Sequence, residues 1–391
     1  MQRNLPLLAS RDEIDIAEAA RTIAGLRPNP ELNIGMEQLP VYTNIRSFKM
    51  PNFYRTNGDG SADPVYTSEF SQLFERGGKR KLRTEQATAE LDATKSRSLD
   101  VLRDQLLTLR EAFTDALLAK ENLALAQETD GQYAETERLM DIRLRAGEIA
   151  EVDLDRVKAA RLPYLQAVMQ AQLEYQQALR KIATSLGVAD SAGSTITGIT
   201  GDLDIRSLVP AAEELRGMAI AERPDLDAAR NEVRAATTGT KLAESLRKRD
   251  VTGSFMAQRS GQDYAVGAML SFQLFTFNNQ RAAIAKAAAE QRLSSTRLHQ
   301  AEVEVQNEVQ QAYQVLLTSQ KALELYNQTA IERSRQIRSI INYSYQRGEA
   351  DLLDVLDAQR SANEILTGYN QARANYMNAI WQLQHAVGRS F

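Results

Sequence analysis

Residues that commonly bind metals or act as nucleophiles are scarce in this sequence. The chain contains two His and no Cys, which excludes thiolate metal sites and disulfides. His299 and His385 lie in helix-like sequence without a second ligand four residues away, so we expect surface or helix-seam residues. The sequence also lacks a nucleophile–base pair and a glycine-rich phosphate loop. It therefore predicts a protein that is not an enzyme, with no cofactor and no metal site.

A turn-forming motif occurs twice, as Arg145-Ala146-Gly147-Glu148 and as Gln346-Arg347-Gly348-Glu349. Glycine permits the backbone conformation of a tight turn. The two glycines lie 201 positions apart, and the same shift relates Gln72-Leu73-Phe74 to Gln273-Leu274-Phe275, Arg80 to Arg281 and Gly187 to Gly388. The agreement predicts an internal twofold repeat, with a first unit over 1–187, a linker over 188–209 and a second unit over 210–391.

Two carboxylates, Asp354 and Asp357, follow the second turn, and Tyr345 precedes it. Both acids lie near the start of a predicted helix. Carboxylates are favoured there because the exposed amide groups of the first turn carry partial positive charge. Taken alone, the pair indicates an ordinary solvated helix surface.

Strand-like sequence opens each repeat, in hairpins predicted at about 31–74 and 250–275. Apolar residues alternate with small or polar residues from Tyr264 to Leu274. This period is typical of a transmembrane β-strand, and also of a soluble hairpin with one buried face. Residues 40–64, rich in Asn, Gly, Ser and Pro, are expected to form an exposed loop. The repeat aligns Glu69 with Leu270, so register or exposure must differ at Glu69.

Long helices must position the turns. Apolar spacing and the scarcity of Gly and Pro predict long helices over 79–145 and 280–345, each able to reach about 100 Å. Shorter helices are expected over 152–186 and 353–387, a further helix over 210–249, and a truncated first helix before the first strand. Helices of this length must pack as antiparallel coiled-coil pairs, which predicts a mainly α protein with a small β part.

The strands cannot function alone in a membrane. Two hairpins supply four strands, whereas even the smallest barrels need about eight. Unpaired edges are not tolerated in lipid. A membrane location therefore requires several copies, and three copies would give about twelve strands. The net charge of −4 gives no argument for nucleic acid as a partner, because nucleic-acid binding normally needs a basic face.

Motifs at the strand–helix junctions resemble those of the TolC family of outer membrane efflux proteins. The first junction, Phe70 to Arg80, includes Gly77, Gly78 and Arg80, and the second, Leu274 to Arg281, includes Asn278, Asn279 and Arg281. Both are most similar to the cobalt–zinc–cadmium efflux branch. The segments at 26–32 and 222–226 also resemble recurring family segments, so the similarity spans nearly the whole chain.

The resemblance implies a homotrimer with a transmembrane β-barrel in outer membrane lipid and an α-helical barrel in the periplasm. It also implies two partners, a periplasmic adaptor protein and an inner-membrane pump of the resistance-nodulation-division type. The turns would contact the adaptor, through Arg145, Gly147, Glu148, Arg347, Gly348 and Glu349.

The same resemblance assigns a periplasmic gate to Tyr345, Asp354 and Asp357. Three copies of the acids around one axis would attract cations. The sequence departs from the family at Ala350, which replaces a gate arginine, so gate closure is expected to differ. Family members normally carry a signal peptide and, in this branch, often a lipidated Cys. These residues show neither, and the first helix starts about midway, so either the sequence is a fragment or its start is misassigned. Lipid anchoring is not supported by these residues.

These observations predict a passive outer-membrane channel of a tripartite efflux system, exporting heavy-metal cations or drugs. The alternative is a soluble periplasmic coiled-coil adaptor, which would leave the duplicated hairpins unexplained. The sequence does not choose among the transported substrates.

Overall fold

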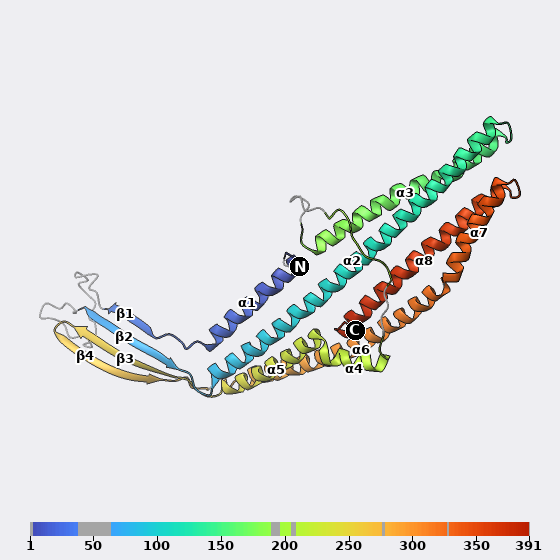
Figure 1. The fold of residues 1–391 in the computed structure, drawn as a ribbon. Helices are drawn as coiled ribbons and strands as arrows, with labels where there is room; N and C mark the ends of the chain where they lie inside the picture. The colour runs from blue at the N-terminus through green and yellow to red at the C-terminus, as the bar shows by residue number, and fades with distance from the viewer. Residues whose placement is uncertain are drawn as a thin grey trace. The chain divides into compact units, whose positions relative to one another are not determined.

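The computed structural model describes residues 3–37, 64–188, 196–204, 209–275, 278–326 and 328–390. The helices are α1 (Leu5–Gly25), α2 (Lys79–Arg145), α3 (Glu151–Ser185), α4 (Ala212–Glu222), α5 (Pro224–Ser245), α6 (Arg281–Leu325), α7 (Gln328–Gln346) and α8 (Leu352–Val387). The strands are β1 (Glu31–Glu37), β2 (Val65–Phe74), β3 (Val251–Ser260) and β4 (Asp263–Ser271). The predicted class, mainly α with four strands, is confirmed (Figure 1).

The chain divides into two compact units. The sheet unit comprises residues 14–94 and 229–298, and the helical unit comprises residues 1–13, 95–228 and 299–391. Each unit combines segments from both halves of the sequence, because each predicted repeat contributes one hairpin of strands and one pair of helices.

The sheet unit contains one antiparallel sheet with strand order β1-β2-β3-β4. Glu69 pairs with Asn33 on one side and with Met256 on the other. Paired residues of antiparallel strands point to the same face, so this register divides the sheet into two chemically different faces.

The apolar face carries all the aromatic side chains of the strands and most of their large aliphatic ones. Its apolar members by register are Leu32, Ile34, Met36, Tyr66, Phe70, Phe74, Val251, Phe255, Tyr264, Val266 and Leu270, and the polar side chains among them are Ser68, Gln72 and Arg259. Most are exposed, with Ile34 at 80%. The opposite, polar face carries Glu69 together with Thr67, Ser254 and Gln258, and its apolar side chains are fewer, among them Val65, Leu73 and Met256. Glu69 and Leu270, which the repeat aligns, therefore lie on opposite faces of the sheet. The carboxylate of Glu69 lies on the polar face and Leu270 on the apolar one.

The helical unit is held by several small apolar clusters. The largest joins α4, α5, α6 and α8 around Leu215, Leu226, Val309 and Ile380. Smaller clusters join α2 to α3 through Ala116 and neighbouring residues, and to α8 and the segment 196–204. Such distributed cores suit long helices, whose narrow apolar stripes each bury only part of the helix surface.

Two predicted helices are interrupted. The helix predicted over 280–345 ends at Leu325 and resumes as α7 at Gln328. Tyr326 at this break lies against Gly368 of α8, where a Cβ would come within 2.4 Å of the Tyr326 hydroxyl. The helix predicted over 210–249 divides at Arg223, whose ψ of 127° is extended, because proline disfavours helical geometry in the residue before it.

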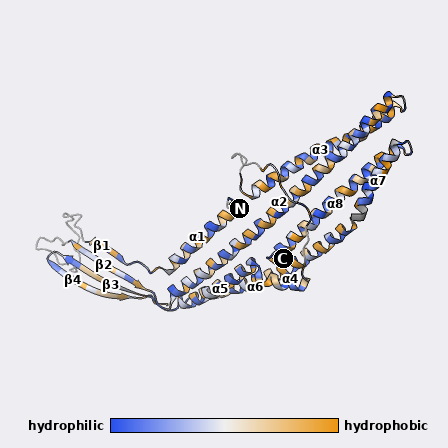
Figure 2. Cartoon of the chain, viewed as in Figure 1, coloured by the Kyte–Doolittle hydropathy of each residue, from blue (hydrophilic) through white to orange (hydrophobic). Residues whose placement is uncertain are grey.

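The remaining predicted elements coincide with observed ones. The helices predicted over 79–145, 152–186 and 353–387 correspond to α2, α3 and α8. The predicted loop over 40–64 and much of the linker over 188–209 lie outside the described residues. Hydrophobic and hydrophilic residues are interspersed along the helices (Figure 2). Of the helices that the structure describes, none combines the length and the apolar character needed to cross a bilayer.

Candidate functional site

The helical unit ends in two turns, and both contain a glycine with left-handed backbone. Gly147, between α2 and α3, has φ 74°, and Gly348, between α7 and α8, has φ 75°. The amide of Glu148 donates to the carbonyl of Arg143, and that of Glu349 to the carbonyl of Ser344, both at 2.9 Å. These bonds satisfy carbonyls that the helix ends leave free. The two turns therefore have the same backbone geometry.

Charged side chains around the turns make local pairs. Arg145 lies 2.6 Å from Asp141 in an exposed ion pair. The Arg347 guanidinium lies 4.4 Å from the ring centre of Tyr343. Glu148 and Glu349 are exposed. The tips consequently present both charge signs to solvent, beside exposed apolar side chains such as Val152 and Leu353.

Tyr345 connects the two helical hairpins within one chain. Its hydroxyl donates to the sulfur of Met140 on α2 at 2.8 Å, and the Arg143 guanidinium lies 5.0 Å from its ring centre. The ring packs beside an apolar cluster that includes Leu154 and Leu352. Burial raises the pKa of Tyr345, so the hydroxyl stays protonated and remains a donor. Sequence reasoning missed Met140 and Arg143, which lie more than 200 positions before Tyr345.

Asp354 takes part in the cap of α8. The backbone amide of Asp351 donates to Asp354 Oδ2 at 3.1 Å, and Asp351 Oδ1 accepts from the amide of Leu352 at 2.6 Å. This reciprocal arrangement is a capping box and satisfies amides that have no partner inside the helix. The local role expected from helix electrostatics is therefore present.

Asp357 lies one turn further along α8 and pairs with Arg360 at 2.7 Å. Both side chains of this pair are exposed. The hydrogen bond that Arg360 donates to Asp357 raises the pKa of the Arg360 guanidinium. Asp354 and Asp357 are thus on the same helix as predicted, but each already has a local partner, whereas Ala350 between the turn and the cap supplies no charge.

The junction residues lie in the sheet unit and have backbone roles. Gly77 and Gly78 have φ values of 81° and 74° directly before α2. At the second junction Asn278 and Asn279 accept from the amides of Gln280 and Arg281 at 3.0 and 3.3 Å. Glycine thus supplies the turn at one junction, and Asn side chains cap the helix at the other. Arg80 and Arg281 are exposed.

A cluster of charges that the sequence did not predict lies where α4, α5, α6 and α8 meet. The guanidinium of Arg223, which is 4% exposed, contacts Asp225 at 2.8 Å, Glu308 at 2.6 Å and the carbonyl of Ala386 at 2.8 Å. His385 lies 2.7 Å from Asp104 and 3.6 Å from Glu308. His385 is therefore a seam residue between two carboxylates. His299 is exposed, 3.7 Å from Glu302.

Comparison with known proteins identifies the family. The model of the family described as outer membrane efflux protein matches residues 1–188 and 215–389. The chain belongs to this family. The predicted resemblance to TolC-like proteins is confirmed, and the alternative of a soluble adaptor is not favoured.

Individual relatives are distant but nearly full-length. The chain is 24% identical to the cobalt-zinc-cadmium resistance protein CzcC of Cupriavidus metallidurans, over 98% of this chain and 85% of that protein. It is 25% identical to the alkaline protease secretion protein AprF of Pseudomonas aeruginosa, over 89% and 75% of the two chains. The CmeC outer membrane channel of Campylobacter jejuni has a TM-score of 0.81 at 14% identity, over 98% and 83% of the two chains.

These findings establish what kind of protein this is. It is an outer membrane efflux channel with a helical part in the periplasm. The fold is that of TolC-like channels, in which the helices contribute to an α-barrel and the strands to a β-barrel.

Proposed function

We propose that this protein is the passive exit duct of a tripartite efflux system and functions as a homotrimer without catalysing a reaction. The observation that carries the proposal is the sheet, which has one apolar face and one polar face. An apolar face suits lipid, and a polar face suits a water-filled lumen. Energy for export then comes from a partner pump rather than from this chain.

Assembly of three copies is supported by surfaces that one chain leaves open. β1 and β4 are the two edges of the sheet, and edges exposed to lipid leave peptide groups unpaired at several kcal/mol each. In the helical unit, α3 exposes a row of apolar residues at helical spacing, namely Leu162, Leu165, Met169 and Leu173. α7 exposes Ile337 and Ile340. A contact between different surfaces of neighbouring copies closes into a ring when the rotation is suitable.

We propose that Tyr345, Asp354 and Asp357 form the periplasmic gate of that ring. Contacts of Tyr345 with Met140 and Arg143 tie α7 to α2, which supports a role in holding the closed state. The pair of Asp357 with Arg360 is exposed and therefore weak, so Asp357 can leave it in the ring. Repeated copies of Asp354 and Asp357 around an axis would then attract cations. Ala350 lacks the charge of the family's gate arginine. Arg143, whose guanidinium lies beside the Tyr345 ring, would supply a positive charge near the gate instead.

We further propose that the two turns bind a periplasmic adaptor, whose inner-membrane partner is a resistance-nodulation-division pump. Similar backbone geometry at Gly147 and Gly348 supports this, since a partner could contact both turns in the same manner. The exposed charges of Arg145, Glu148, Arg347 and Glu349 would provide electrostatic specificity.

The substrate we propose is a heavy-metal cation. CzcC is named as a cobalt, zinc and cadmium resistance protein, and the junction motifs resemble the same branch. Export of another solute is the competing assignment, because AprF is named for protease secretion. The acidic gate favours cations over anions.

Planar-bilayer conductance tests the channel and its gate. The purified protein is expected to be a trimer in detergent by mass and to conduct ions with cation preference. The double variant Asp354→Asn/Asp357→Asn should lose much of that preference, because it removes two negative charges per copy. The control Asp153→Asn/Asp155→Asn removes the same charge from the start of α3. An unaltered cation preference in the gate variant would exclude the gate role, and a non-conducting monomer would exclude the channel.

A further inference from the structure

Basic side chains gather where the strands of the sheet unit meet its helices. We call Arg27, Arg76, Arg80, Lys81, Arg247 and Lys248 the junction belt. All six are exposed. They lie close together in space, since a Cβ on Gly77 would come within 2.8 Å of the Lys248 side chain, and Arg27, Arg80 and Lys81 line one hollow. The belt is positive in a chain whose net charge is −4.

Acidic residues near the belt are already engaged. Glu75 accepts from both terminal nitrogens of Arg83. Asp250 pairs with Lys79 at 2.7 Å and accepts from the backbone amide of Arg76 at 2.8 Å. Lys81 has only a loose, exposed contact with Glu85 at 3.7 Å. Within the described part of the chain, the side chains of Arg27 and Arg80 have no ion-pair partner, so the hollow retains positive charge.

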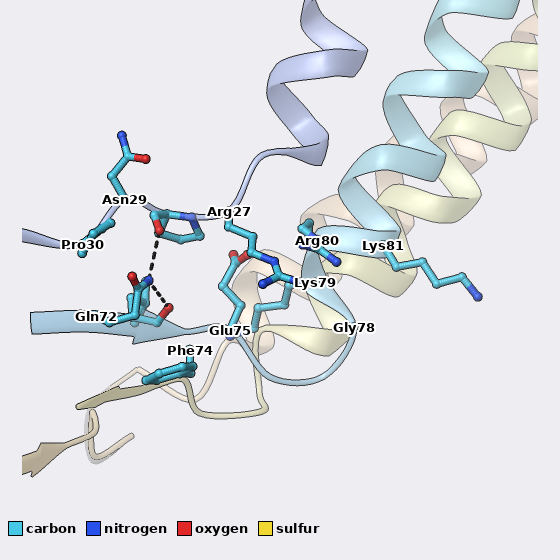
Figure 3. A pocket seen from close by; sticks show the side chains of 12 residues that line it. Arg27, Asn29, Pro30, Gln72, Phe74, Glu75, Gly78, Lys79, Arg80 and Lys81 are labelled. Carbon is cyan, nitrogen blue, oxygen red and sulfur yellow. Dashed lines mark hydrogen bonds between the residues drawn. The ribbon is translucent and has the colours of Figure 1, made fainter.

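The hollow has a volume of about 710 Å³ and is open to solvent. Figure 3 shows Arg27 and Lys79 gathered beside Glu75, with Arg80 on the adjoining turn of helix and Lys81 pointing away. Gln72 donates to the carbonyls of Pro28 and Leu73, both at 3.0 Å, and so fixes the wall nearest the sheet (Figure 3).

Apolar surface adjoins the positive charge. Phe74 lines the hollow and, by register, lies on the apolar face together with Phe70 and Phe255. A ligand in the hollow therefore meets basic side chains on one side and, at Phe74, the start of the apolar face on the other. This combination fits an amphiphile with an anionic head, because a free anion gains nothing from the apolar side.

We propose that the hollow binds the phosphate of an anionic phospholipid, whose acyl chains lie along the apolar face of the sheet. The proposal rests on the proposed function, which places the sheet in the bilayer. Strands of 7 to 10 residues approach the length that crosses the hydrocarbon core when tilted. The helix end of the sheet therefore lies at the lipid headgroups of the periplasmic leaflet.

Native mass spectrometry of the full chain in detergent, titrated with phosphatidylglycerol or phosphatidylcholine of the same acyl chains, tests the proposal. Wild type should retain phosphatidylglycerol preferentially. Arg27→Gln/Arg80→Gln should weaken that binding by about thirtyfold, because each basic residue near an anionic lipid contributes about fivefold. The matched control Arg292→Gln/Arg297→Gln, on the exposed side of α6, should bind as wild type does.

Charge-preserving variants guard against a folding defect. Arg27→Lys/Arg80→Lys should keep most of the preference, since ammonium groups also contact phosphate. Equal retention of both lipids by wild type, or unchanged retention in the Gln variant, would overturn the proposal. Competition by glycerol phosphate at the lipid's own concentration would also overturn it, because the site would then bind a free anion.

The proposed function is judged separately by conductance. A wild-type trimer that conducts but shows no anionic lipid preference refutes only the lipid site. A wild-type protein that neither assembles nor conducts refutes the channel proposal, whatever lipid it retains.

Discussion

At the scale of single residues, the most constrained side chain is Arg223. Its buried guanidinium donates hydrogen bonds to two carboxylates and to the carbonyl of Ala386, which take the place of the water molecules that it would bind in solvent. Removing one partner from a buried charge is costly, because the remaining charge loses its compensation. The extended backbone of Arg223, just before Pro224, separates α4 from α5. This break places the Arg223 side chain between α6 and the end of α8.

Glu308 gives a pH prediction at the same site. The imidazole of His385, 3.6 Å away, lowers the pKa of Glu308 most. The hydrogen bond from Arg223 lowers it further against the effect of burial, and the value falls from 4.5 to about 2. A carboxyl whose folded pKa is depressed stabilises the fold above the unfolded pKa, and this contribution is lost as pH falls through the folded one. The loss is therefore expected between about pH 4.5 and pH 2.

Glu308→Gln should lower the free energy of unfolding at neutral pH by about 1 kcal/mol. The expected loss is small because the carboxylate of Glu308 is 42% exposed and solvent screens its charge. The variant should also depend less on pH below 4.5. Thermal melts in detergent from neutral to acidic pH measure both effects. Glu304→Gln, exposed on the same helix, is the control. If the melting temperatures of Glu308→Gln and wild type fall equally between pH 4.5 and pH 2, Glu308 is not the source of the pH dependence.

At the scale of secondary-structure elements, α2 and α8 meet through a row of polar contacts. Thr129 donates to Asn363 at 3.1 Å, and Asn370 donates to Asn122 at 3.2 Å. Such contacts specify the register of two long helices, because sliding by one turn would leave the amides unpaired. They contribute less to stability than apolar packing of the same area would.

Gln359 is the weakest member of this row. It is 2% exposed, its amide nitrogen lies 3.5 Å from Thr136 Oγ1, and its Oε1 has no hydrogen-bond partner within the described residues. Gln359→Leu should stabilise the fold by about 1 kcal/mol, since an unsatisfied buried acceptor is removed. Thr136 keeps its own bond to the carbonyl of Gln132. The melting temperature of Gln359→Leu should therefore be higher than that of wild type. The control Gln371→Leu, on the exposed side of α8, should leave the melting temperature unchanged. A lower melting temperature for Gln359→Leu would refute the argument.

Local sequence was informative where local physics decides the structure. The apolar period of α2 and α8 and the positive φ of Gly147 and Gly348 follow from neighbouring residues alone. The break after Leu325 could not be predicted, because the segment contains neither Gly nor Pro, and the close approach of Tyr326 to Gly368 of α8 is a tertiary contact. Likewise, Arg223 finds Glu308 and Ala386 at separations of 85 and 163 residues. Tertiary packing overrides propensity at such positions.

The candidate site shows the same division. Sequence placed Tyr345, Asp354 and Asp357 on the correct helices, because turn and cap signals are local. It could not supply Met140 and Arg143, whose proximity to Tyr345 depends on how two hairpins pack. The capping role of Asp354 is compatible with a gate role, since a carboxylate has more than one acceptor position.

At the scale of the whole molecule, the proposed trimer requires a surface through which copies of the chain join. The row on α3, Leu162, Leu165, Met169 and Leu173, is exposed in a single copy of the chain and is a candidate for that surface. Burying one such side chain is worth about 1.5–3 kcal/mol. An interface built from this row is therefore sensitive to single charges, which cannot be desolvated without a partner.

Leu162→Glu/Met169→Glu should consequently shift the protein from trimer to monomer while preserving its helices. Met169 is 64% exposed in one chain, so the charges are tolerated before assembly and opposed only in the interface. Mass measurement in detergent together with far-ultraviolet circular dichroism separates the two effects. The control Leu162→Met/Met169→Leu retains apolar volume at both positions and should remain trimeric. If the Glu variant stays trimeric, α3 faces solvent or a partner of another kind, and a different surface must close the ring.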